Sequence, residues 1–164
     1  MKESIDSYER AITIDSKHVN SYYNAGLAFQ EMGELDKALE AYAYIFQLEP
    51  LHLDSRLNYC NIVLSTGDVH EAEKCYFAII SINPHFTRGL INLAGLYHQQ
   101  QEFSKATNYY TMALEVDPSN PIALHSIRAL QNKADDVQPE SSVAYIRELF
   151  DRFLLFFNCN NVLT

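Results

Sequence analysis

The sequence has few basic residues. Its 164 residues include 12 Lys and Arg against 21 Asp and Glu, which gives a formal net charge of -9. A negative field of this size repels phosphate backbones and anionic lipid surfaces. The composition therefore argues against nucleic acid and membranes as partners.

Cysteine is also scarce. The chain has 3 cysteines, and their positions follow no spacing typical of a disulfide framework or a zinc site: Cys60, Cys75 and Cys159. No basic segment followed by an apolar run opens the chain, so nothing indicates a secretory signal. We therefore expect an intracellular, reducing setting, the cytoplasm in the first place, with the nucleus left open.

Long hydrophobic runs are absent. The densest apolar stretch, Leu149 to Phe157, is interrupted by Asp151 and Arg152. It is also far shorter than the roughly 20 residues that a membrane-spanning helix needs. The sequence therefore predicts no membrane helix.

Motifs for catalysis are missing as well. The sequence has no glycine-rich phosphate loop, no nucleophile elbow, no HExxH and no GxGxxG. His70, Cys60 and Cys75 lack the spacing of metal ligands, so buried packing is the better interpretation of the two cysteines. We expect a non-enzymatic protein without cofactor or metal.

A period of 34 residues organises most of the chain. Residues of the same type recur at this spacing in four independent registers: Pro50, Pro84 and Pro118; Tyr8, Tyr42, Tyr76 and Tyr110; Ala38, Ala72 and Ala106; Asn24, Asn58 and Asn92. A fixed period of this length is typical of helical repeat arrays.

Each period reads as two helices. Apolar residues between Val19 and Pro50 step by three or four positions, as on one face of a helix. Gly33 and Gly67 lie between the two halves, where a helix end favours a residue that can adopt positive φ, and the prolines end the second helices. The sequence therefore predicts helical hairpins separated by short turns.

The segment Tyr22 to Pro50, YYNAGLAFQEMGELDKALEAYAYIFQLEP, resembles the tetratricopeptide repeat family. The resemblance implies an all-α fold, a right-handed superhelical solenoid of antiparallel helix pairs. Three positions depart from the family pattern: Arg56 and Leu90 replace large aromatic residues, and Gln101 replaces the glycine between helices. None of them is expected to break the fold.

The array is expected to cover residues 1–134. Its predicted parts are a half repeat at 2–15, full repeats at 19–50, 53–84 and 87–118, and a capping helix at 121–134, followed by a linker at 135–140 and an amphipathic helix with a tail at 141–164. The half repeat and the apolar tail could each mediate self-association.

The first helices of such hairpins line the inner trough of the superhelix. There Asn24, Asn58 and Asn92 occupy equivalent positions, and an amide can both donate to and accept from an extended peptide backbone. The resemblance to the repeats of O-linked N-acetylglucosamine transferases implies that such a ladder holds the partner chain. The alternative is that each asparagine only bonds to a neighbouring helix.

Further trough candidates surround the three asparagines: Tyr23, Leu57, Asn61, Arg88 and His98. The family's clamp for chaperone C-terminal carboxylates needs Lys, Asn and Arg on three successive first helices. Tyr23, Leu27 and Asn92 replace three of its residues, Asn58 matches, and Arg88 matches only the charge of its last lysine. Chaperone tails are therefore not the expected ligand.

We expect a non-catalytic scaffold or adaptor that binds a protein or extended peptide in the trough. The alternative is a substrate-recruiting part of a larger enzyme. AYIRELFDRF at 144–153 resembles the domain junction of proteins that fuse these repeats to an S-adenosylmethionine-dependent methyltransferase, whereas the asparagine ladder resembles the glycosyltransferase.

Overall fold

The computed structural model describes residues 18–131, and all of the regular secondary structure in this range is α-helical. The prediction of an all-α helical repeat fold is confirmed. Its right-handed superhelical course is a property of the whole array and stays a prediction. No helix between residues 18 and 131 is long and apolar enough to cross a membrane.

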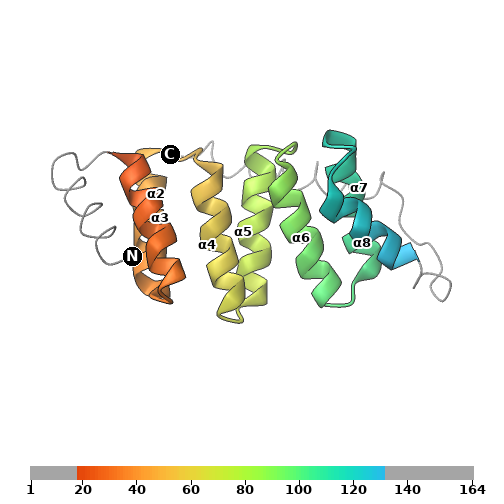
Figure 1. Cartoon of the computed structure of the whole chain (residues 1–164), viewed down its shortest axis with the longest axis horizontal. Coiled ribbons are helices and arrows are strands. Elements are labelled where there is room, and N and C mark those ends of the chain that lie inside the picture. The colour runs from red at the N-terminus through yellow and green to blue at the C-terminus, as the bar shows by residue number, and fades with distance from the viewer. Residues whose placement is uncertain (1–17, 132–164) are drawn as a thin grey trace, which may run out of the picture. The chain divides into compact units, whose positions relative to one another are not determined.

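The chain divides into two compact units after Ile82, a division that the repeat pattern does not predict. The described part of the N-terminal unit contains four helices: α2 (Val19–Glu31), α3 (Leu35–Leu48), α4 (Leu53–Ser65) and α5 (Val69–Ile82). Successive helices pack against one another in this order (Figure 1). The unit therefore contains two complete hairpins, α2–α3 and α4–α5.

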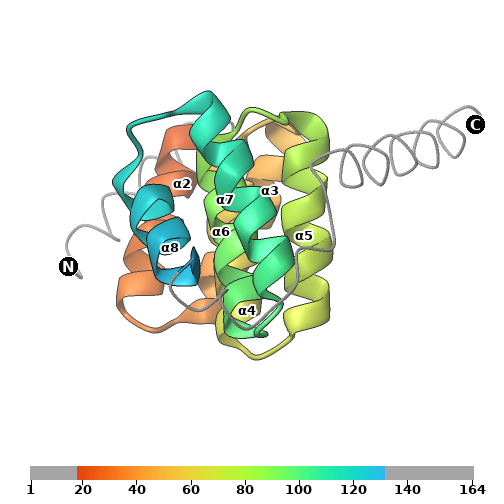
Figure 2. The same ribbon diagram turned by 90° about the vertical axis from the view of Figure 1, so that its right-hand side faces the viewer.

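The C-terminal unit begins at Asn83. Its described helices are α6 (Thr87–Gln99), α7 (Phe103–Val116) and α8 (Pro121–Gln131). Helix α7 packs against both α6 and α8 (Figure 2). The unit is thus a third hairpin, α6–α7, followed by a single helix at the position predicted for the capping helix.

Several predicted segments lie outside the described residues. These are the half repeat at 2–15, the last three residues of the capping helix at 132–134, the linker at 135–140 and the segment at 141–164. The predictions made for them, including self-association, are therefore not addressed by the structure.

Each of the three hairpins has one residue with positive φ in its turn. Gly33 has φ of 76° and Gly67 has φ of 93°, which confirms the positive φ predicted for both glycines. Gln101 adopts φ of 63° at the equivalent place in the third hairpin. The departure from glycine at this position therefore leaves the turn unchanged.

Arg56 shows how a second departure is accommodated. The guanidinium group of Arg56 lies 4.6 Å from the ring centroid of Phe46, and its Nε donates a hydrogen bond to the Pro50 carbonyl at 2.8 Å. Partial burial lowers the pKa of this guanidinium. Arg56 therefore packs its planar group on a neighbouring ring, as an aromatic side chain would.

Gly26 allows α2 to approach α3 closely. A Cβ atom at this position would lie 2.6 Å from Cε1 and 2.8 Å from Cζ of Tyr42, whose side chain is fully buried. The ring cannot move aside without disturbing its neighbours, because protein cores are close-packed. A glycine is therefore required for this contact.

Replacing Gly26 with alanine is expected to lower the free energy of unfolding by about 1 kcal/mol, measured by urea denaturation. Overpacking costs about 2 kcal/mol, and the better helix propensity of alanine offsets about 1 kcal/mol of it. Gly95→Ala is the matched control, because its new Cβ meets only the Tyr110 hydroxyl at 3.8 Å. That variant should be more stable by up to about 1 kcal/mol, and equal effects at the two sites would contradict the prediction.

Candidate functional site

The side of the N-terminal unit formed by its two first helices carries the candidate site. We call it the first-helix face and define it by Tyr23, Asn24 and Leu27 on α2 with Asn58 and Asn61 on α4. Residues three or four apart on a helix lie on the same side, which explains why these positions face together. A hydrogen bond from Asn58 Nδ2 to the Tyr23 hydroxyl, 3.3 Å long, joins the two helices directly.

Asn58 also reaches a third helix. Its Nδ2 donates a second hydrogen bond, 3.3 Å long, to the hydroxyl of Tyr42 on α3. That hydroxyl in turn donates to Oε1 of Gln30 on α2 at 3.4 Å. Because Asn58 is only 8% exposed, its amide group acts first as a link between the first hairpin and α4.

The Tyr42 side chain is buried among Ala38, Ile45 and Ile62. Burial raises the pKa of its hydroxyl to about 12 from 10.0, although the hydrogen bond from Asn58 acts in the opposite direction. The hydroxyl group is therefore neutral over the whole physiological range, and it stays available as both donor and acceptor in the cluster.

The raised pKa of Tyr42 predicts a loss of stability at alkaline pH. A hydroxyl whose pKa is higher in the folded than in the unfolded chain contributes fully below pH 10.0, and this contribution is lost as the pH rises toward about 12. At about pH 11 the loss is about 1.4 kcal/mol. Urea unfolding at about pH 9 and about pH 11 should show a loss that is larger in the wild-type chain than in Tyr42→Phe by this amount, because burial and Tyr44 also raise the pKa of Tyr22 in both chains. The same loss in both chains would contradict the assignment.

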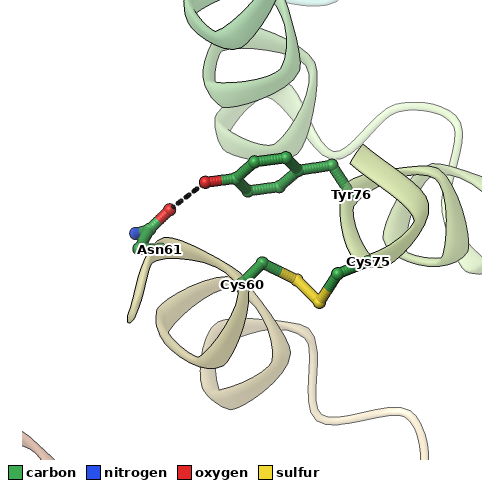
Figure 3. Close-up of a disulfide and its surroundings, with 4 residues drawn as sticks. All are labelled: Cys60, Asn61, Cys75 and Tyr76. Atoms are coloured by element: carbon green, nitrogen blue, oxygen red, sulfur yellow. Dashed lines mark hydrogen bonds between the residues drawn. A yellow bond between two sulfur atoms is a disulfide. The ribbon is translucent and has the colours of Figure 1, made fainter. Parts of the chain in front are cut away.

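Asn61 forms a second polar contact on the first-helix face. Its Oδ1 accepts a hydrogen bond from the Tyr76 hydroxyl on α5 at 2.7 Å (Figure 3). Tyr76 is 1% exposed, whereas Asn61 is half-buried. The contact therefore fixes the orientation of the Asn61 side chain, which still reaches the surface.

A disulfide lies directly beside this contact. Cys60 on α4 and Cys75 on α5 are bonded, with their Cα atoms 5.6 Å apart. The prediction that the cysteines form no disulfide is therefore wrong. The reducing setting inferred from them loses that support, because disulfides persist mainly in oxidising environments.

The predicted site residues of the N-terminal unit do not all reach the surface. Asn24 is exposed, and Tyr23 is half-buried. Leu57 is only 1% exposed, so its side chain belongs to the core and offers no surface to a partner. The prediction of Leu57 as a trough residue is corrected accordingly.

The remaining predicted residues lie on α6 in the C-terminal unit. Arg88 is exposed, whereas Asn92 and His98 are half-buried. The His98 ring meets the ring of Phe103 edge-on, with centroids 5.8 Å apart. Since Asn24 and Asn58 belong to one unit and Asn92 to the other, a continuous asparagine ladder stays a prediction.

Sequence reasoning missed the hydroxyl groups of Tyr42 and Tyr76, because it used these residues only as markers of the period. The signal was present, because tyrosine rather than phenylalanine recurs at this register. A buried tyrosine hydroxyl usually has a hydrogen-bond partner. The asparagines one helix away supply that partner in both cases.

Comparison with models of known protein families shows which family the chain resembles. Models of the tetratricopeptide repeat family match residues 1–33, 19–50 and 87–120, which together make up about half of the sequence. The chain belongs to the tetratricopeptide repeat family. None of these models reaches the segment at 144–153 that resembles a methyltransferase junction. No curated protein matches the sequence.

Solved structures share the fold at low sequence identity. MamA is 17% identical with a TM-score of 0.67, and the match covers 80% of this chain and 77% of MamA. The first TPR of Spaghetti (RPAP3), bound to the HSP90 peptide SRMEEVD, is 18% identical with a TM-score of 0.65 over 74% of this chain and 97% of its own. The Arabidopsis OM64 TPR domain is 16% identical with a TM-score of 0.63, covering 70% and 95%.

Proposed function

We propose that the chain is a protein-interaction module that binds an extended peptide or a protein segment on the first-helix face. The proposal depends mainly on Asn24 and Leu27, which are both exposed and lie one helical turn apart on α2. An exposed amide beside an apolar side chain that is 36% exposed suits a peptide backbone and one apolar side chain of the ligand. Similar folds include a domain in complex with a peptide, which supports the proposal.

The proposal assigns different roles to the asparagines. Asn24 contacts the ligand, whereas Asn58 mainly holds α2, α3 and α4 together through its two hydrogen bonds. Arg88, Asn92 and His98 on α6 are the corresponding candidates of the C-terminal unit, taken by itself. The alternative, recruitment of substrates to an enzyme, depends on residues 141–164 or on an asparagine ladder across both units.

A random peptide library displayed on phage provides the test. We expect the full chain to select peptides whose affinity falls at least about tenfold, or about 1.4 kcal/mol, in Asn24→Ala/Leu27→Ser. Gln47→Ala is the matched control, because it removes an exposed amide from the second helix α3. No selected peptides, or equal loss in both variants, would refute the proposal.

The peptide SRMEEVD serves as a second probe, and we expect it not to bind. It is acidic, and the chain has a formal net charge of -9. Two cationic positions of the clamp carry the uncharged Tyr23 and Asn92, and only Arg88 keeps the charge of a clamp lysine, so the repulsion between like charges is poorly compensated. Binding of SRMEEVD comparable to that of the selected peptides would show that the ligand class is wrong.

A further inference from the structure

The disulfide between Cys60 and Cys75 connects the middle of α4 to the middle of α5 (Figure 3). Cys60 is fully buried, whereas Cys75 is half-buried. A small nucleophile can therefore approach the bond from the Cys75 side. In such an attack on Sγ of Cys75, the sulfur of Cys60 would be the leaving group.

This cross-link is specific to the second hairpin. The residues 34 positions earlier are Gly26 and Ala41, and those 34 positions later are Ala94 and Tyr109. At Gly26 any side chain would collide with Tyr42. These positions in the other hairpins cannot form a disulfide, whereas α4 and α5 are held by a covalent bond that a thiol reductant can open.

The residues that follow the two cysteines form the hydrogen bond between Tyr76 and Asn61. Two thiols cannot approach as closely as two bonded sulfur atoms, and the Cys60 thiol is fully buried in a close-packed interior. We expect the separation of the two thiols to shift α4 relative to α5 at this level. The Asn61 side chain moves with it, because its partner is on α5.

We propose that the second hairpin is a thiol–disulfide switch that changes the placement of Asn61 on the first-helix face. The consequence for ligand binding rests on the proposed function, whereas the movement of Asn61 does not. The partner in the reaction is a dithiol reductant, and in the opposite direction the matching disulfide.

The chemistry balances as a two-electron exchange. A thiolate of the dithiol attacks Sγ of Cys75, the Cys60–Cys75 bond breaks, and Cys60 leaves as a thiolate that takes up a proton. The second thiol of the reductant then attacks the mixed disulfide and releases Cys75, which is protonated in turn. The protein gains two thiols and the reductant becomes a disulfide.

The first test follows side-chain amide groups by NMR in the full chain carrying Cys159→Ser, with and without dithiothreitol. We expect reduction to expose two thiols to titration in denaturant and to shift the side-chain amide signals of Asn61. The side-chain amide signals of Gln30, which bonds Tyr42 in the first hairpin, should stay in place. Cys60→Ala/Cys75→Ala, combined with Cys159→Ser, should show no response to the reductant.

Two results would overturn the proposal. One is an Asn61 signal that does not move when the two thiols appear, because Asn61 would then be uncoupled from the disulfide. The other is an equal shift at Asn61 and Gln30, because reduction would then unfold the unit instead of rearranging one hairpin.

A second test measures affinity for peptides selected on the oxidised chain. We expect reduction to change the dissociation constant by at least about threefold in the wild-type chain and not in Asn61→Ala. An equal change in both chains would contradict the role of Asn61. If no peptide is selected, the proposed function fails, and the NMR comparison alone decides whether the switch exists.

Discussion

Replacing Tyr42 with alanine is expected to lower the free energy of unfolding by about 4 kcal/mol. The side chain is fully buried, and its ring fills the space between Gly26 on α2 and the apolar residues of α3 and α4. Alanine would leave a cavity beside a glycine, where no side chain can expand to fill it. Urea denaturation followed by far-ultraviolet circular dichroism measures the effect.

Two variants separate the contributions to this loss. Tyr42→Phe keeps the ring and removes only the hydroxyl, so it should cost about 1 kcal/mol. Tyr44→Ala removes a half-buried ring from the same helix, where the main ring contact is with Tyr22, and it should cost clearly less than Tyr42→Ala. A loss below about 1 kcal/mol for Tyr42→Ala would mean that the core repacks around the gap.

Replacing Asn58 with alanine is expected to lower the free energy of unfolding by about 2 kcal/mol. The change removes the amide that donates to both Tyr23 and Tyr42, so the buried hydroxyl of Tyr42 loses one hydrogen-bond partner. Buried polar groups that lose their partner typically cost about 1–3 kcal/mol. Urea denaturation of Asn58→Ala, of Tyr42→Phe and of the double variant gives the coupling energy between the Asn58 amide and the Tyr42 hydroxyl.

Asn24→Ala is the matched control for this prediction, because Asn24 lies 34 residues before Asn58 at the same place in its repeat. Asn24 is exposed, so the change should alter stability by no more than about 0.5 kcal/mol. Equal costs at the two positions would indicate that Asn58 has no special structural role. The pair thus separates the binding role from the packing role that the repeat pattern leaves undecided.

The helices and turns were predictable because their determinants are local. Gly33 and Gly67 mark turns whose positive φ favours glycine, and Pro50, Pro84 and Pro118 come just after the second helices. A period of 34 residues repeats the proline signal three times and the glycine signal twice. The positions of the helices therefore follow largely from the residue types, with the turn at Gln101 as the exception.

The site was less predictable because burial depends on neighbours in other repeats. A shared register gives Asn24 and Asn58 the same position on their helices, yet Asn24 is exposed and Asn58 is buried, with only 8% of its surface exposed. The difference arises from Tyr23 and Tyr42, whose hydroxyls approach α4 from the preceding hairpin. The period identifies equivalent positions, whereas the side chains that cover each of them differ from repeat to repeat.

The disulfide was not predicted for a different reason. Cys60 and Cys75 are 15 residues apart, which matches no linear motif, but they flank the turn at Gly67 almost symmetrically. In an antiparallel hairpin, residues at equal distances from the turn lie opposite each other. Counting outward from the turn, instead of comparing the spacing with motifs, would have paired the two cysteines.

Gln101 has a consequence of a different kind. Its amide bonds the carbonyl of His98 and the next amide bonds that of Tyr97, at 3.1 and 2.9 Å, the same pattern and lengths as at Gly33 and Glu34. The left-handed conformation disfavours a side chain by about 1–2 kcal/mol. The packing of α6 on α7 thus imposes the turn on an unsuitable residue. In this array, a hairpin can therefore lose its consensus glycine and keep its shape. The strain at the substituted residue does not change the course of the backbone.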